Sequence, residues 1–272
     1  MSKKFWSTLA FVACFPSICS AVDFISAQPT PRVEYWETRI KQIDAAVADK
    51  AALPQVKLLF VGDSITDFWL LDDNPWVKGQ KFGRRIWNAS FNAAGSPNFG
   101  LNIGISGDRT EHVLYRLLPR KQGGLGQIDA LELDPEFIVL MIGVNNTWAP
   151  EEPVQESVFA GASAVIRALQ ERKPKARLIV QSLLPLNEPS KNVGIVRPVN
   201  LRLRTLVAGR PTNCVFYLDL YPSFVDDKGA QIASYFNDGI HPNEAGYRVW
   251  RDRLVAFLDQ VRKSGSAPTS CN

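Results

Sequence analysis

Ser64 is the first residue whose position suggests chemistry. An apolar run over residues 58–61 ends in Gly62-Asp63-Ser64, a pattern typical of a buried strand that enters a tight turn. In an open α/β sheet, reacting groups collect at the carboxyl ends of strands, so a hydroxyl here is a candidate nucleophile. The alternative is structural, because Asp and Ser are both good N-cap residues and the turn would then only start a helix.

Asp238 and His241 form a second chemical pair. A hydrolytic triad needs a nucleophile, an imidazole base and a carboxylate that holds the imidazole in the correct tautomer. Gly239 and Pro242 flank the two residues, and a turn there can place the carboxylate against the ring. A plain Asp-Gly turn ahead of the next helix is the alternative. The other histidine, His112, falls early in a helical pattern and is interpreted as structural.

Composition argues against several classes of function. Two histidines are too few for a His-rich zinc site, and the four cysteines lack finger-like spacing. The 31 basic and 27 acidic residues are interleaved and give a net charge of +4, so no nucleic-acid partner is expected. The apolar fraction of 46% and the charged fraction of 21% are those of an ordinary globular protein.

Alternating strand and helix patterns must position the reactive groups. Short apolar runs are separated by amphipathic segments, which is the order expected for parallel strands with crossover helices. The predicted strands cover residues 56–61, 101–105, 137–142, 176–184 and 214–220, and the predicted helices cover 34–50, 110–118, 153–172, 199–208 and 244–261. The sequence therefore predicts an α/β fold, a three-layer α/β/α sandwich around a five-stranded parallel sheet, in a single domain over residues 22–272. The small, polar tail from about residue 264 is expected to be mobile.

The segment 69–100 is rich in aromatic residues and long for a simple connection. We expect it to contain a helix and some loop packed near the site. Its aromatic side chains could line a substrate cleft, although packing in the core or in an interface is the commoner fate of such residues.

Polar residues follow several of the predicted strands. Ser64, Gly107 and Asn145 each come shortly after an apolar run. Because the carboxyl ends of parallel strands lie on one edge of the sheet, we expect these residues to converge although they are far apart in the chain.

Four short blocks of the chain resemble those of the SGNH, or GDSL-type, hydrolases. The blocks are Gly62-Asp63-Ser64, Gly107, Gly143-Val144-Asn145 and Asp238-x-x-His241, in the family's order, and the match spans roughly residues 56–260. The stretch 103–117, together with Asn145-Asn146, is similar to the branch that contains the platelet-activating-factor acetylhydrolase catalytic subunits. The family usually has Asn-Asp where this chain has Asn145-Asn146, and that branch carries Asn-Asn.

The resemblance implies a flavodoxin-like SGNH hydrolase fold and a serine esterase mechanism. Ser64 would be the nucleophile, His241 the base that later protonates the leaving alcohol, and Asp238 the residue that orients the imidazole. The backbone N–H groups of Ser64 and Gly107 and the side-chain amide of Asn145 would bind the oxyanion. No metal and no organic cofactor is implied.

The expected reaction is removal of a short acyl group, most simply acetyl, from an O-acylated carbohydrate. A lipase, lysophospholipase-type or thioesterase acylhydrolase is the alternative within the family, and an exported glycan-binding protein without catalysis is the alternative from another class. Asp63, Trp69, Asn146 and Trp148 lie beside the catalytic blocks and are candidate substrate contacts. The related branch forms dimers, so a homodimer is a further hypothesis.

The first 21 residues have the pattern of a secretory signal peptide. Lys3 and Lys4 precede an apolar stretch over 5–15, and Ala21 offers a cleavage site. The stretch is too short to span a membrane, and no other segment is long enough to do so.

The predicted compartment is the bacterial periplasm or the exterior. Asn145 lies in an Asn-Asn-Thr glycosylation pattern, and a glycan there would block its expected role, which favours a bacterial enzyme. Cys214 and Cys271 would remain after signal cleavage, and an oxidising compartment would allow them to pair. Two unrelated cysteines are the alternative.

Overall fold

A five-stranded parallel sheet forms the centre of the computed structural model, which describes residues 23–32, 36–211 and 213–265. The strands lie in the order β2-β1-β3-β4-β5. They are β1 (Leu58–Gly62), β2 (Gly100–Asn102), β3 (Phe137–Met141), β4 (Arg177–Gln181) and β5 (Val215–Leu218). The order is that of flavodoxin-like sheets, in which ligands bind where the strand order reverses, here between β1 and β3.

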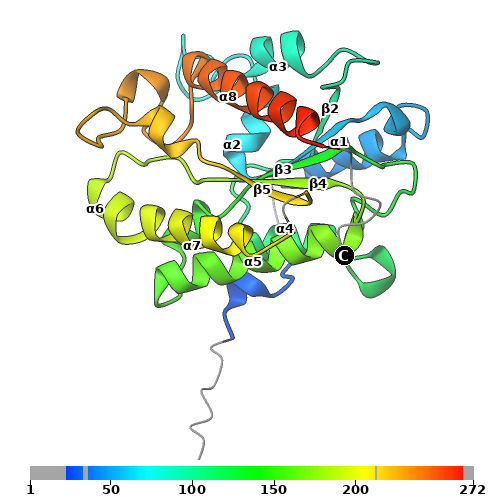
Figure 1. The fold of residues 1–272 in the computed structure, drawn as a ribbon, viewed down its shortest axis with the longest axis horizontal. Helices are drawn as coiled ribbons and strands as arrows, with labels where there is room; N and C mark the ends of the chain where they lie inside the picture. Colours follow the sequence, from blue (N-terminus) through cyan, green and yellow to red (C-terminus); the bar gives the residue numbers. More distant parts are fainter. Residues whose placement is uncertain (1–22, 33–35, 212, 266–272) are drawn as a thin grey trace, which may run out of the picture.

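Helices cover both faces of this sheet, as Figure 1 shows, with α5 and α7 on one side and α3 and α8 on the other. The longer helices are α1 (Trp36–Ala48), α3 (Arg84–Ser90), α4 (Thr110–Leu117), α5 (Val154–Arg172), α7 (Arg197–Ala208) and α8 (Glu244–Lys263). Short turns of helix are α2 (Ser64–Asp67) and α6 (Pro189–Lys191). The predicted α/β fold with five parallel strands is confirmed.

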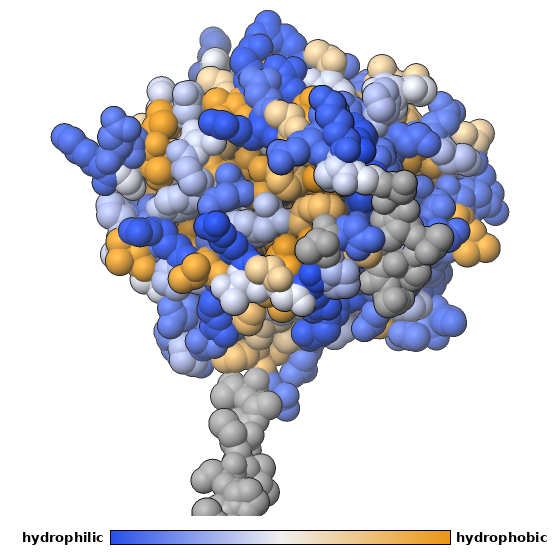
Figure 2. Space-filling view, in the orientation of Figure 1, coloured by the Kyte–Doolittle hydropathy of each residue, from blue (hydrophilic) through white to orange (hydrophobic). Residues whose placement is uncertain are grey.

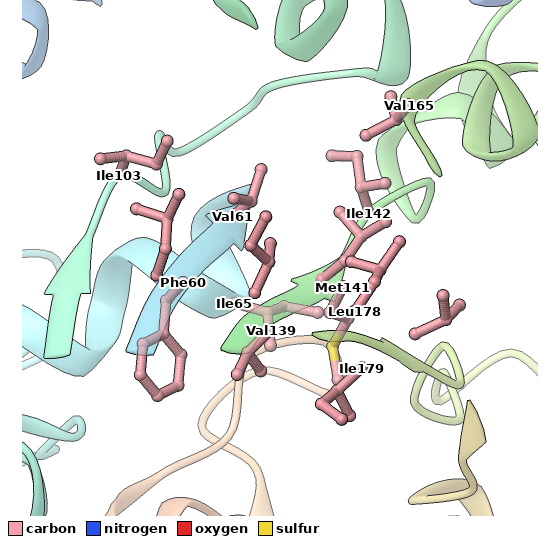
Figure 3. Packing of buried hydrophobic residues seen from close by; sticks show 14 of the residues in the cluster. Phe60, Val61, Ile65, Ile103, Val139, Met141, Ile142, Val165, Leu178 and Ile179 are labelled. Atoms are coloured by element: carbon pink, nitrogen blue, oxygen red, sulfur yellow. The ribbon is translucent and has the colours of Figure 1, made fainter. Parts of the chain in front are cut away.

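Burial on both faces explains why the strands appear in the sequence as continuous apolar runs. Every residue of β1, β3 and β4 is buried, as expected for parallel strands covered by helices on each side. Figure 3 shows Val61 of β1, Met141 of β3 and Ile179 of β4 within one hydrophobic cluster. The outer surface seen in Figure 2 is mainly hydrophilic, with smaller apolar areas.

Most aromatic residues of the segment 69–100 belong to the core. Trp69 has no exposed surface, and its ring lies 4.5 Å from that of Tyr247 and 5.0 Å from that of Trp250, measured between centroids. Trp87 and Phe91 pack against the same ring. These contacts attach α3 and α8 to the segment that follows Ser64.

The fourth strand is shorter than predicted because its backbone leaves the ladder while still buried. Residues 182–184 are buried, but the N–H and C=O of Leu183 are both bonded to the side chain of Asn200, at 2.8 and 3.0 Å. A side-chain amide thus replaces the neighbouring strand as the backbone's partner, which the apolar pattern alone does not reveal.

Two sequence predictions concern residues at the ends of the chain. The signal peptide, residues 1–21, lies outside the described residues, as does Cys271. Cys214 is disulfide-bonded, and its pairing with Cys271 stays a prediction. Within the described ranges, no helix is both long and apolar enough to cross a membrane.

Candidate active site

The turn after β1 presents Ser64 at the reversal point of the sheet. Asp63 caps α2 by accepting a hydrogen bond from the Ile65 N–H at 3.0 Å, and Ser64 is the first residue of that helix. A Cβ on Gly62 would lie 2.2 Å from the Thr66 hydroxyl and 2.4 Å from the Met141 carbonyl. Only glycine fits here, because the turn folds back against the neighbouring strand.

Ser64, His241 and Asp238 form a continuous hydrogen-bonded chain. Ser64 Oγ lies 2.8 Å from His241 Nε2, and His241 Nδ1 lies 2.6 Å from Asp238 Oδ2. The three side chains come from the turn after β1 and from the loop before α8, which are far apart in sequence. This geometry is that of a nucleophile, a base and the carboxylate that orients the base.

The ionisation of Asp238 sets the tautomer of His241. Partial burial would raise the pKa of Asp238, but hydrogen bonds from the His241 ring and from the backbone N–H groups of His241 and Ile240 outweigh it and lower the pKa to about 2. At neutral pH the carboxylate can therefore only accept hydrogen bonds. It follows that Nδ1 carries the proton and Nε2 is free to take the proton of Ser64.

The loop that carries Asp238 and His241 is held from several directions. Gly239 has a φ of +83°, and a Cβ there would lie 2.4 Å from the Asn187 side chain, so this position requires glycine. Gln231 Nε2 donates to the Gly239 carbonyl at 2.8 Å. The turn that separates acid from base is thus packed against the loops that follow β4 and β5.

A hairpin-like loop over residues 72–82 braces the other side of the triad. Asn237, next to Asp238, donates its side-chain amide to the Lys81 carbonyl at 3.1 Å. Gln80 Nε2 donates in return to the Asn237 carbonyl at 3.1 Å. Asn74 accepts hydrogen bonds from the N–H groups that follow it, which stiffens the loop tip.

Donors for an oxyanion lie at the ends of β1, β2 and β3. Within the described part of the chain, the backbone N–H groups of Ser64 and Gly107 have no hydrogen-bond acceptor. Gly107 adopts a φ of +80°, a conformation that disfavours any other residue. The Asn145 amide donates one hydrogen to the Asp108 carbonyl at 2.7 Å, which fixes its orientation and leaves the second hydrogen for a ligand.

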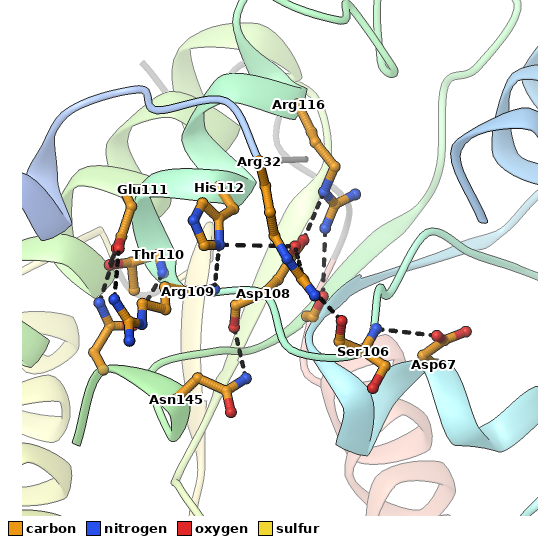
Figure 4. A network of polar contacts seen from close by, with 12 residues as sticks. Arg32, Asp67, Ser106, Asp108, Arg109, Thr110, Glu111, His112, Arg116 and Asn145 are labelled. Atoms are coloured by element: carbon orange, nitrogen blue, oxygen red, sulfur yellow. Dashed lines mark hydrogen bonds and ion pairs between the residues drawn. The ribbon is translucent and has the colours of Figure 1, made fainter. Parts of the chain in front are cut away.

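Buried charges hold the loop that carries Gly107, as Figure 4 shows. The Arg116 guanidinium has no exposed surface and donates to Asp108 Oδ2 at 2.8 Å and to the Ile103 carbonyl at 2.7 Å. Arg32 reaches the same carboxylate, Oδ1, at 3.1 Å, and donates to the Ser106 carbonyl at 2.8 Å. Two arginines therefore fix the loop on both sides of Gly107.

These arginine contacts also explain why β2 ends earlier than predicted. The Asn102 and Gly104 carbonyls accept hydrogen bonds from Arg39, at 2.9 and 3.0 Å. Arg39 in turn pairs with Asp67 of α2, at 2.9 Å. After Asn102 the N–H groups of Ile103 and Ile105 still donate to β1, but the carbonyls of this segment bond to arginine side chains of α1 and α4.

Asn146 connects the turn after β3 to the start of α4 from a buried position. Its side chain accepts from the Thr110 N–H at 3.0 Å and donates to Glu111 at 2.9 Å. His112, also on α4, accepts from the Arg109 N–H at 3.0 Å, and burial together with nearby arginines lowers its pKa to about 4. His112 is therefore neutral and caps its helix, in agreement with the structural role that the sequence suggested.

The structure separates the candidate substrate contacts into buried and exposed residues. Asp63, Trp69 and Asn146 are buried, so they support the site from behind and offer no surface to a substrate. Trp148 is 42% exposed, and Lys191 Nζ lies 3.8 Å from the centre of its ring.

Trp76 is an exposed aromatic residue beside the triad that the sequence did not single out from its neighbours. Its side chain is 67% exposed, and its ring lies 5.5 Å from that of Phe68. The Phe68 ring lies 4.9 Å from that of His241. The aromatic content of the segment was visible in the sequence, but only packing shows which tryptophan faces outward next to the base.

No group of three or more His, Cys, Asp or Glu side chains within residues 23–32, 36–211 and 213–265 could hold a metal ion. The residues gathered around Ser64 have the chemistry of acyl transfer, with a nucleophile, a base and convergent N–H donors.

Comparisons with known proteins agree with this geometry. The model of the GDSL-like Lipase/Acylhydrolase family matches residues 60–249. The platelet-activating factor acetylhydrolase IB subunit alpha1 of Bos taurus is 34% identical over 188 residues, which are 67% of this chain and 73% of the relative.

Solved structures share the fold at lower identity. A GDSL-like lipase from Bacteroides thetaiotaomicron superposes with a TM-score of 0.57 at 20% identity, covering 81% of this chain and 98% of its own. A carbohydrate esterase family 3 protein from Talaromyces cellulolyticus superposes with a TM-score of 0.51 at 17% identity, covering 78% and 100%. The family model, the relative and the shared fold together show that this chain belongs to the GDSL-like lipase/acylhydrolase family.

Proposed function

We propose that this protein is a serine ester hydrolase that removes a short acyl group, most simply acetyl, from an O-acylated carbohydrate. The observation that carries the proposal is the hydrogen-bonded chain from Ser64 through His241 to Asp238. Membership of an acylhydrolase family makes an ester or thioester the expected bond.

The geometry supports a two-step acyl transfer. Ser64 Oγ attacks the ester carbonyl carbon while its proton passes to His241 Nε2. The resulting oxyanion is stabilised by the N–H groups of Ser64 and Gly107 and by the Asn145 amide, each typically worth about 3 kcal/mol in the transition state. His241 then protonates the departing alcohol as the carbon–oxygen bond breaks, and a water molecule, deprotonated by the same ring, releases the acid from Ser64.

Restricted access to the nucleophile supports a short acyl group. Ser64 is only 3% exposed, so little room is open to solvent at its side chain. A small acyl group can reach it with little rearrangement, whereas a bulky one would require the surrounding loops to move. The relative described above is an acetylhydrolase subunit, which supports the same choice.

Exposed aromatic side chains support a carbohydrate as the alcohol part. Trp76 is exposed and packs on Phe68, which in turn packs on His241, while Trp148 after Asn145 is exposed with Lys191 over one face of its ring. Sugar rings present apolar C–H faces that pack on such surfaces, and an indole loses little conformational entropy in doing so. A lipid ester is the alternative alcohol, and hydrolysis of long-chain esters would favour it.

The first experiment compares p-nitrophenyl acetate, butyrate and octanoate as substrates of the wild-type protein and of Ser64→Ala. We expect kcat/KM to fall steeply with acyl length and to vanish for every ester in Ser64→Ala. Turnover that survives in the variant would contradict the assignment of the nucleophile. Absence of turnover and of labelling by a serine-reactive phosphonate would instead favour a glycan-binding protein without catalysis.

We further propose that the protein is exported and that it forms a homodimer. Cleavage after Ala21 would give a mature chain beginning at Val22, which N-terminal sequencing of the protein from the periplasm or medium would detect. Light scattering of the same material gives the mass, and a value near twice that of the mature chain would support a homodimer.

A further inference from the structure

A basic cavity adjoins the triad on the side of β4 and β5. Its volume is about 430 Å³, and it is formed by the loops that follow these two strands. Asn187 and Gln231, both in its lining, are the residues that contact Gly239 between Asp238 and His241. The cavity is therefore formed in part by residues that hold the turn between Asp238 and His241.

The charges in this cavity are unbalanced. Arg197 and Lys228 line it, and no carboxylate does. In the described ranges neither side chain forms an ion pair or a hydrogen bond, and neither do the Tyr221 hydroxyl and the Asn187 amide, which also line the cavity.

Two cationic side chains near the cavity are paired with carboxylates. Arg202, on the same helix as Arg197, pairs with Glu156 at 2.6 Å, and Lys191 pairs with Glu188 at 3.4 Å. Within the described residues, Arg197 and Lys228 thus lack the carboxylate partners that Arg202 and Lys191 have. A smaller adjoining cavity of about 180 Å³ shares Arg197 and Tyr221 and includes one carboxylate, Asp219.

We infer that this basic cavity binds a carboxylate on the alcohol part of the substrate, so that the preferred ester is an acetylated acidic sugar. This inference rests on the proposed function, because it concerns the substrate of the same site. A guanidinium presents a planar fork of donors that matches a carboxylate, and the Lys228 ammonium, the Tyr221 hydroxyl and the Asn187 amide add donors around it. Because the cavity lies beyond the Asp238–His241 turn, it accepts the alcohol part of the ester rather than the acyl group.

The test compares two esters that differ in one charge, the acetyl esters of methyl glucuronide and of methyl glucoside. We expect wild-type protein to prefer the uronide in kcat/KM by about tenfold, since a charge-assisted hydrogen bond is typically worth that much. Arg197→Gln should reduce the preference about fivefold or more, and 0.5 M salt should weaken it in the wild type. The matched control is Arg253→Gln, which removes an exposed arginine from α8 on the opposite face of the sheet and should keep the wild-type preference.

The outcomes separate the inference from the proposed function. If the wild-type protein shows no hydrolysis of p-nitrophenyl acetate that depends on Ser64, the proposed function itself is wrong. Equal hydrolysis of the two sugar esters, unchanged in Arg197→Gln, would overturn the cavity assignment while leaving the esterase intact.

Two further arms complete the test. If Arg197→Gln does not fold, as judged by circular dichroism, Lys228→Gln takes its place, because that residue lies on an exposed turn. Faster hydrolysis of acetylated glycerophosphate than of the uronide, with the same dependence on Arg197, would identify a phosphate group and overturn the assignment to a carboxylate.

Discussion

Replacing Asp63 by Asn should remove a large pH dependence from the stability of this protein. Asp63 lies directly before the nucleophile and has no exposed surface. Burial raises the pKa of its carboxyl group from 3.8 to about 7, and the charge of Asp108 acts in the same direction, while the hydrogen bond from the Ile65 N–H opposes it. Among the described residues, the second oxygen, Oδ2, has no hydrogen-bond partner.

The sign and size of the effect follow from the two pKa values. Below about pH 4 the carboxyl group is protonated in both the folded and the unfolded chain. Between that pH and about 7 the unfolded chain loses the proton while the folded chain keeps it, so the free energy of unfolding falls as the pH rises. A pKa difference of about three units corresponds to a total loss of about 4 kcal/mol, of which about 2 to 3 kcal/mol falls between pH 5 and pH 8.

The assay is urea unfolding of the wild type and of Asp63→Asn at a series of pH values from 5 to 8. Asn keeps the capping hydrogen bond to Ile65 but cannot ionise. Because the other titrating groups are common to both chains, the difference between the two curves isolates Asp63. We expect the variant to gain about 2 to 3 kcal/mol relative to the wild type across this range.

A matched control is Asp227→Asn, which removes an exposed carboxylate of a surface turn. Parallel curves for the wild type and Asp63→Asn would refute the reasoning, because they would mean that the carboxyl before Ser64 does not change its protonation in this range.

Three further predictions concern the catalytic chain, the exposed aromatic residue and the buried charges. Asp238→Asn should lower kcat on p-nitrophenyl acetate on the order of 10⁴-fold, because an amide no longer holds His241 in the reactive tautomer; a loss below tenfold would exclude this role. Trp76→Ala should raise KM about fivefold or more for an acetylated oligosaccharide and much less for p-nitrophenyl acetate, whereas equal changes would indicate a general disturbance of His241. Arg116→Met should lower the free energy of unfolding by about 3 to 5 kcal/mol in urea titration, because Asp108 would keep only Arg32 as a charged partner; unchanged stability would show that the buried pair contributes little.

The structure brings the predicted catalytic residues together where chemistry and local structure coincide. Ser64 follows a buried strand directly, and Asp238 and His241 share one turn, so their types and spacing already indicated a nucleophile and an oriented base. Gly239 and Gly107 adopt positive φ values that few other residues tolerate, which is why glycine marks both turns in the sequence.

The prediction of substrate contacts was weaker because exposure is not a local property. Trp69 and Trp76 occur in the same aromatic segment, and no pattern in the sequence distinguishes them. Trp69 is buried because Tyr247 and Trp250 of α8 pack against it, whereas Trp76 is left exposed at the tip of a loop. Helix α8 lies near the C-terminal end of the chain, far from Trp69 in the sequence, so the burial of Trp69 depends on tertiary packing.

The sequence by itself determined the order of strands and helices, the parallel sheet and the candidate catalytic residues, because hydrophobic periodicity and turn chemistry act over short distances. Only the tertiary structure decided how Arg116 and Asp108 hold the Gly107 loop, and how Arg197 and Lys228 meet in a basic cavity. These charged residues come from separate helices and loops, and their spacing in the sequence forms no recognisable pattern. Their roles arise from burial and unpaired charge, which exist only after the sheet and its helices have packed together.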